Sequence, residues 1–185
     1  MRIFLEAGPG FSNGTDAYGR EIVESANSDA IVNKCAEYLS AQKEIRDRSI
    51  QVMPIKNASS RLEEISAEDL LISVQVNLYG AAAGEGLRGF YRSSKQHNSE
   101  KCKALAITVT KGLHDHIDLY YHGVYNEQRS RFPQLESIVK SKSVAALVEI
   151  GFAHEHKSLT ADATVTKNIG DGLGKGILRH LSSQH

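Results

Sequence analysis

A single carboxylate stands inside the most apolar stretch of the chain and is the first candidate for chemistry. Glu149 lies within Val144-Ala-Ala-Leu-Val-Glu-Ile-Gly-Phe152. An apolar run of this length is typical of a strand that is buried on both faces. Because an ionised carboxylate is costly to bury, we expect Glu149 at the carboxyl end of its strand, facing a cleft. A Glu that simply emerges where the strand meets solvent is the alternative.

Two further patterns could carry chemistry, and both have a simpler interpretation. His154 and His156 follow the Glu149 strand and could offer two imidazoles to a metal ion. In an extended chain, however, residues two apart point to opposite faces, which favours ordinary surface histidines. Gly170-Asp-Gly-Leu-Gly-Lys-Gly176 resembles a phosphate-binding loop only superficially, because it follows no strand and lacks the Lys-Ser/Thr ending. We expect these glycines to let a helix pack closely.

The segments that must position these residues alternate between strand and helix patterns. Strands are predicted at Ile3–Ala7, Ile50–Pro54, Leu70–Asn77 and Leu87–Arg92, a short one near Leu119–Val124, and the last at Val144–Phe152. Helices are predicted at Ser25–Ser40, Ser59–Ala67 and Asn98–Leu113, and at the chain's end, where Val165, Ile169, Leu173 and Ile177 recur. This alternation predicts one α/β domain over residues 1–185, with a mostly parallel or mixed central sheet and helices on both faces.

The composition excludes several classes of partner. The 185 residues include 22 Lys+Arg and 22 Asp+Glu, so no charge excess predicts a nucleic-acid or anionic-membrane partner. Cys35 and Cys102 fall on apolar helical faces, where we expect buried thiols. No stretch could span a bilayer, and the apolar run at the start is too short for a signal peptide. We therefore expect a protein made in the cytoplasm, unless a leader was trimmed.

Four separated stretches together resemble the zinc-dependent N-acetylmuramoyl-L-alanine amidases of bacteria and their phages. They are Ile3-Phe-Leu-Glu-Ala-Gly-Pro-Gly10, Glu24 with the helix after it, Leu71-Ile-Ser-Val-Gln-Val-Asn77 with Gly89-Phe90-Tyr91, and Leu147-Val-Glu-Ile-Gly-Phe152. The resemblance covers nearly the whole chain. It implies a single α/β domain and a relation to peptidoglycan, in which this family cuts the amide between muramic acid and L-alanine.

The resemblance also implies roles for individual positions. The family's three zinc ligands fall on Pro9, Glu24 and Gln75, where the family has His, Glu and His. Its catalytic Glu falls on Glu149. Pro9 has no donor atom, and the amide oxygen of Gln75 binds zinc poorly. Without the metal, water is not acidified and the scissile carbonyl is not polarised. We therefore expect no bound cofactor and no ordinary amidase activity.

The leading hypothesis is a catalytically degenerate amidase-fold protein that acts by binding. Glu24, Gln75, Asn77 and Glu149 would line a metal-free pocket for a peptidoglycan fragment, or the partner would be a cell-wall-associated protein. The alternative is an active amidase, for example a phage endolysin acting at the cell wall, in which His154 or His156 joins Glu24 as a zinc ligand. A third possibility is that the two replacements were introduced to disable an active enzyme.

Overall fold

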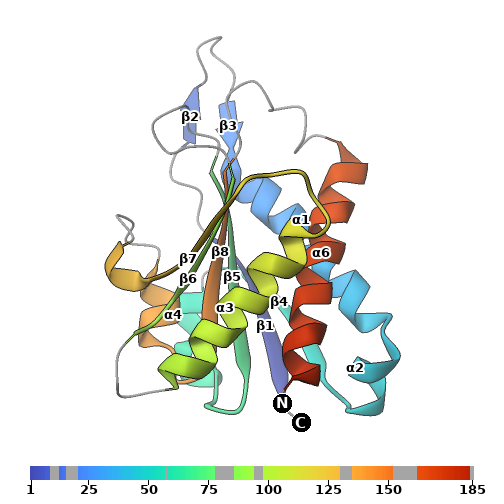
Figure 1. Ribbon diagram of the computed structural model, residues 1–185, viewed down its shortest axis with the longest axis vertical. Helices are drawn as coiled ribbons and strands as arrows, with labels where there is room; N and C mark the ends of the chain where they lie inside the picture. Colours follow the sequence, from blue (N-terminus) through green and yellow to red (C-terminus); the bar gives the residue numbers. More distant parts are fainter. Residues whose placement is uncertain are drawn as a thin grey trace.

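The computed structural model describes residues 1–8, 13–15, 21–56, 58–77, 86–93, 98–129, 135–151 and 162–183. Its main sheet has six strands in the order β4-β1-β5-β8-β6-β7 (Figure 1). The bounds are Gln51–Lys56 for β4, Arg2–Ala7 for β1, Leu70–Asn77 for β5, Val144–Gly151 for β8, Gly86–Tyr91 for β6 and Tyr121–Asn126 for β7. Strands β4, β1, β5 and β8 are mutually parallel, whereas β6 runs antiparallel to β8 and parallel to β7. The mixed, mostly parallel sheet predicted from the sequence is confirmed.

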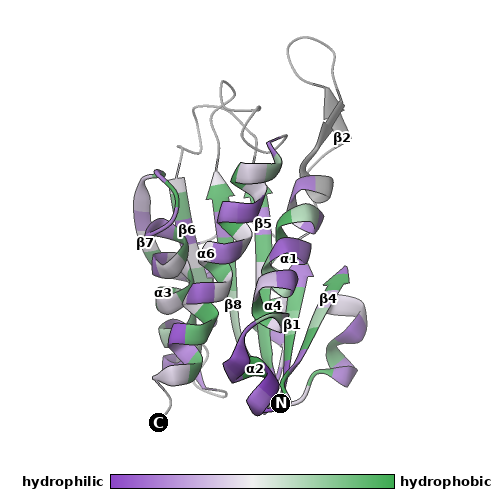
Figure 2. Ribbon diagram, turned by 90° about the vertical axis from the view of Figure 1, so that its right-hand side faces the viewer, coloured by the Kyte–Doolittle hydropathy of each residue, from purple (hydrophilic) through white to green (hydrophobic). Residues whose placement is uncertain are grey.

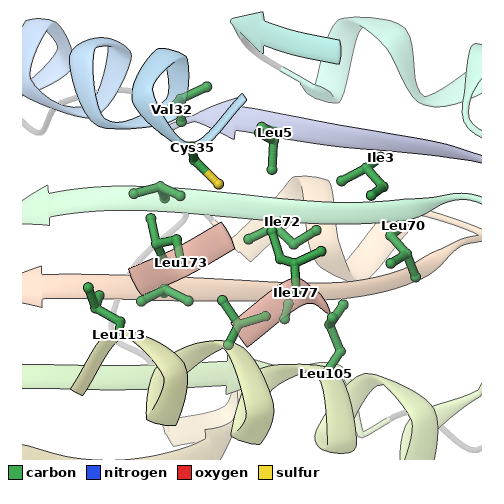
Figure 3. Close-up of a cluster of buried hydrophobic side chains, with 14 of the residues drawn as sticks. Ile3, Leu5, Val32, Cys35, Leu70, Ile72, Leu105, Leu113, Leu173 and Ile177 are labelled. Carbon is green, nitrogen blue, oxygen red and sulfur yellow. The ribbon is translucent and has the colours of Figure 1, made fainter. Parts of the chain in front are cut away.

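Three long helices cover one face of this sheet. They are α1 (Glu24–Ser40), α3 (Ser99–His114) and α6 (Ala163–Ser182), which lie in front of the strands in Figure 2. Their apolar faces meet the sheet in the larger core, where Leu105 of α3 and Leu173 and Ile177 of α6 surround Ile72 of β5 (Figure 3). Burial of these faces supplies most of the driving force for folding.

The C-terminal helix packs between its two neighbours because its glycines have no side chains. A Cβ at Gly176 would lie 2.6 Å from the Cα of Val109 in α3, and one at Gly170 would lie 2.8 Å from the backbone nitrogen of Cys35 in α1. Helix α6 begins where the carboxylate of Asp162 accepts a hydrogen bond of 2.7 Å from the backbone of Thr164. The close-packing interpretation of the glycine run is therefore confirmed.

The other face of the sheet is covered by shorter elements, the 3-10 helix η1 (Ala58–Glu64) and α4 (Glu136–Lys140). Both are held to β1 by Glu6, which is only 3% exposed. Its carboxylate accepts hydrogen bonds of 2.7 Å from the backbone of Ala58 and from the hydroxyl of Ser137. Neutral donors thus satisfy one carboxylate that is buried inside a strand.

The remaining elements are short. They are the hairpin β2 (Asn13–Thr15) with β3 (Glu21–Val23), the helix α2 (Lys43–Asp47) and the 3-10 turn η2 (Glu127–Arg129). The hairpin, α2 and α4 were not predicted, because elements this short show no clear hydrophobic periodicity. Both cysteines are buried free thiols, as expected. Among the described helices, none combines the length and the apolar character that a membrane crossing needs.

Candidate functional site

Strand register brings three polar side chains into one row near the carboxyl ends of β5 and β8. Gln75 of β5 is paired with Glu149 of β8, and Glu149 is paired in turn with Arg88 of β6. Directly paired residues share one face of a sheet. This face carries the smaller core, in which Leu147 of β8 and Phe90 of β6 are buried. The row Gln75–Glu149–Arg88 is therefore the candidate site.

Glu149 is buried, and a guanidinium contacts its carboxylate. Its exposed fraction is 2%. Nη1 of Arg88 lies 2.7 Å from Oε1 of Glu149, and the two side chains are 20% and 3% exposed. A carboxylate removed from water needs hydrogen-bonded partners, because an unpaired buried charge is strongly destabilising, and here the partner is itself charged. Glu149 does lie near the carboxyl end of its strand as predicted, but it does not emerge into solvent.

Gln75 is the neutral member of the row. The residue is 2% exposed, and its buried Nε2 has no hydrogen-bond partner in the part of the chain that the structure describes. The end of β1 lies against it. The backbone nitrogen of Gly8 donates a 2.8 Å hydrogen bond to the carbonyl of Val74, and a Cβ on Gly8 would lie 3.4 Å from the Cβ of Gln75.

The first helix is anchored to the same end of β5. Helix α1 begins at Glu24, in agreement with the expectation for that residue. One turn later, the hydroxyl of Ser28 accepts a 3.1 Å hydrogen bond from the backbone nitrogen of Val76. This hydrogen bond fixes the first turns of α1 to the end of β5.

The structure brings together only part of the predicted site. Gln75 and Glu149 are neighbours, as the metal-free-pocket hypothesis requires. The side chains of Glu24 and Asn77 are not described, and Pro9, His154 and His156 lie outside the described residues. Across the described ranges, no group of three or more His, Cys, Asp and Glu side chains is placed to hold a metal ion.

Arg88 is the functional candidate that sequence reasoning missed. It is the only charged residue of Gly86-Leu-Arg-Gly-Phe-Tyr91, just as Glu149 is the only charged residue of β8. A lone cation in one strand and a lone carboxylate in another are a possible signal, but they identify each other only once the two strands are known to be neighbours. Their antiparallel pairing joins residues 61 positions apart, which no local pattern contains.

A cavity elsewhere in the molecule does not involve this row. Its volume is about 250 Å³, and it lies beside the first turns of α6. Its lining combines apolar side chains with His116, Asp118 and Asn168. It shares no residue with the row Gln75–Glu149–Arg88, so the register-defined row remains the candidate site.

The fold is that of the N-acetylmuramoyl-L-alanine amidases. The chain superposes on an amidase from Clostridium difficile 630 with a TM-score of 0.76 and 21% identity, covering 100% of this chain and 98% of that one. It is similar to the catalytic domain of CwlV from Paenibacillus polymyxa var. colistinus, with a TM-score of 0.74, 17% identity and 98% coverage of both chains.

A third similar structure is the CwlD amidase of Clostridioides difficile in complex with the GerS lipoprotein, with a TM-score of 0.73, 20% identity and 98% coverage of both chains. No family model matches the sequence, and no curated protein sequence matches it either. The likeness in structure therefore defines the fold of this chain over essentially its whole length.

Proposed function

We propose that this protein is an amidase-fold binding protein that works without zinc and without amidase activity. Its ligand is a peptidoglycan fragment or a cell-wall-associated protein. The observation that carries the proposal is the ion pair between Arg88 and Glu149, at 2.7 Å. The resemblance assigns the catalytic carboxylate to Glu149, and that carboxylate is engaged by a cation of the protein itself.

The residues at the implied ligand positions do not fit zinc. Proline at position 9 offers no donor atom, and position 75 offers an amide in place of an imidazole. Gln75 and Glu149 lie in adjacent strands, with the guanidinium of Arg88 on the far side of Glu149. One carboxylate at position 24 and one amide do not make the three good ligands that a catalytic zinc site needs.

The same geometry opposes general-base chemistry by Glu149. An N–H group of Arg88 already donates to Oε1 of Glu149, so only the lone pairs outside this contact could accept a water proton. Water that is not bound to a metal has a pKa of about 15.7, compared with about 7 on a catalytic zinc ion. A carboxylate of ordinary basicity has little capacity to generate hydroxide from such water. Binding is the function that such a site still supports.

A protein partner is a reasonable form of this binding. The CwlD amidase, which has a similar fold, has been solved in complex with the GerS lipoprotein. A scaffold of this kind can therefore engage another protein. For this chain, the amide of Gln75 is the neutral polar group of the row that could pair with an amide of a muropeptide or of a partner's peptide segment.

Metal analysis and a muropeptide assay test the proposal together. We expect protein purified without chelators to contain far less than one zinc per chain and to release no L-alanine-headed peptide from purified muropeptides. Glu149→Gln should then behave as the wild type in that assay. Stoichiometric zinc, with peptide release abolished by chelator and by Glu149→Gln, would instead establish the active amidase with relocated ligands.

Binding is tested separately by titration calorimetry with a soluble muropeptide that contains the muramoyl-L-alanine amide. We expect intact muropeptide to be recovered after binding, and Gln75→Leu to weaken binding because it removes a polar group of the row. The matched control is Gln51→Leu, which changes an exposed amide of the same type on β4. If the muropeptide does not bind, the protein-partner form of the proposal is the one that stands.

A further inference from the structure

Arg88 enters the site from a strand that the family resemblance does not assign to metal binding. Strand β6 runs antiparallel to β8 and places Arg88 directly across from Glu149. The guanidinium is mostly buried, since the side chain is 20% exposed. Desolvated charges interact more strongly than charges in water, so this contact is stronger than an ion pair on the surface would be.

Two observations show that the Glu149 carboxylate is oriented towards Arg88 and away from Gln75. Gln75 is paired with Glu149 and carries two amide hydrogens, yet its buried Nε2 makes no hydrogen bond within the described residues. The carboxylate bonds to the guanidinium instead. The negative charge of Glu149 is thus balanced from the β6 side, and the carboxylate accepts no hydrogen bond from the Nε2 of Gln75.

We propose that Arg88 takes the place of a metal ion in this fold: it neutralises Glu149 and disfavours divalent cations at this edge of the sheet. The proposal rests on the proposed zinc-free function and names the residue that enforces it. Neighbouring strands are about 4.8 Å apart, so position 75 lies about 10 Å from the β6 strand axis. The arginine side chain extends from β6 to Glu149, over much of that distance. Its positive charge therefore repels a cation bound near position 75.

Restoring the implied ligands tests this role of Arg88. We would compare Pro9→His/Gln75→His with Pro9→His/Gln75→His/Arg88→Gln, using zinc competition against a chromophoric chelator at fixed pH and ionic strength. We expect the variant without the arginine to bind zinc at least tenfold more tightly. Lys56→Gln in the same histidine background is the control, because it removes an equal charge from an exposed side chain that pairs with Asp29.

Double-mutant stability supplies the second measurement. Arg88→Gln and Glu149→Gln should each destabilise the chain. The double variant should lose less stability than the two single losses added together. We expect its unfolding equilibrium constant to be at least tenfold smaller than additive effects would give. Arg88→Met replaces Arg88→Gln if the glutamine variant does not fold. Equal zinc affinity with and without Arg88, zinc binding by neither background, or additive stability effects would overturn the proposal. Zinc in the wild-type protein would instead overturn the proposed function.

Discussion

At the scale of single residues, the sheet buries two carboxylates on one face and treats them differently. Glu6 is held by the neutral donors of Ala58 and Ser137, whereas Glu149 is held by the guanidinium of Arg88. The sequence identified Glu149 because a carboxylate in an apolar run is conspicuous. It could not identify the partner, because the charge on Arg88 becomes relevant only when β6 pairs with β8.

Another residue-scale ion pair gives a pH prediction. Asp69 is 2% exposed, and its carboxylate accepts hydrogen bonds from the side chain of Arg2 at 2.6 Å and from the backbone of Ser66 at 2.9 Å. Burial alone would raise the pKa of Asp69, but the bonds from Arg2 and Ser66 outweigh it and hold the pKa below its usual value. Asp69 therefore stabilises the fold above the pKa of the unfolded chain, about 3.9.

Asp69→Asn should lower the free energy of unfolding at pH 7 by about 1–3 kcal/mol, because it removes a charged hydrogen-bond acceptor from a buried site. The difference from wild type should persist down to about pH 4 and shrink as the pH falls through the lowered native pKa. Urea unfolding at a series of pH values measures it. Glu68→Gln, at the exposed neighbouring position, is the control. A difference that stays constant down to pH 2 would contradict this account.

At the scale of elements, the long strands and helices could be predicted from their sequences, whereas the contacts between them could not. The predicted strand Leu70–Asn77 is confirmed to the residue, and the predicted helix Asn98–Leu113 agrees with Ser99–His114 to one residue at each end. Periodicity fixes which face of such an element is apolar. Periodicity does not predict that α6 lies between α1 and α3. That arrangement depends on Gly170 and Gly176, which have no side chains and so allow the helices to approach closely.

Gly176→Ala tests this helix contact. The added methyl group would lie 2.6 Å from the Cα of Val109 and 2.7 Å from the carbonyl oxygen of Thr108, and backbone atoms cannot move aside cheaply. We expect a loss of about 1–3 kcal/mol in unfolding free energy, although alanine is otherwise the better helix former. Thermal and urea unfolding measure the change. Asn168→Ala, at an exposed position of α6, should be neutral or slightly stabilising. Equal behaviour of the two variants would argue against close packing.

At the scale of the whole molecule, the alternation of strands and helices was enough to predict an α/β sheet with helices on both faces. The order of the strands was not predictable from local patterns. Strand β8 comes from the last quarter of the chain, yet it lies between β5 and β6. Only this insertion puts Gln75, Glu149 and Arg88 in one row.

The proposed absence of zinc predicts how the molecule responds to chelators. A ligand that binds only the native state raises its stability, and its removal lowers the melting temperature. We expect incubation with EDTA to leave the melting temperature of the wild-type protein unchanged, as measured by differential scanning calorimetry. The variant Pro9→His/Gln75→His/Arg88→Gln, loaded with zinc, serves as the positive control and should lose stability. A fall of several degrees in the wild type would show a resident metal.

The position of β8 also has a consequence for biosynthesis. Until residues 144–151 leave the ribosome, β5 and β6 each lack the neighbour that lies between them in the finished sheet. Their edges then expose unpaired backbone N–H and C=O groups beside mostly apolar side chains, and such edges are prone to pair with other chains. Such long-range pairing slows folding. Nascent chains that stall before β8 should therefore depend on chaperones, and the row of polar side chains can form only once the sheet is closed.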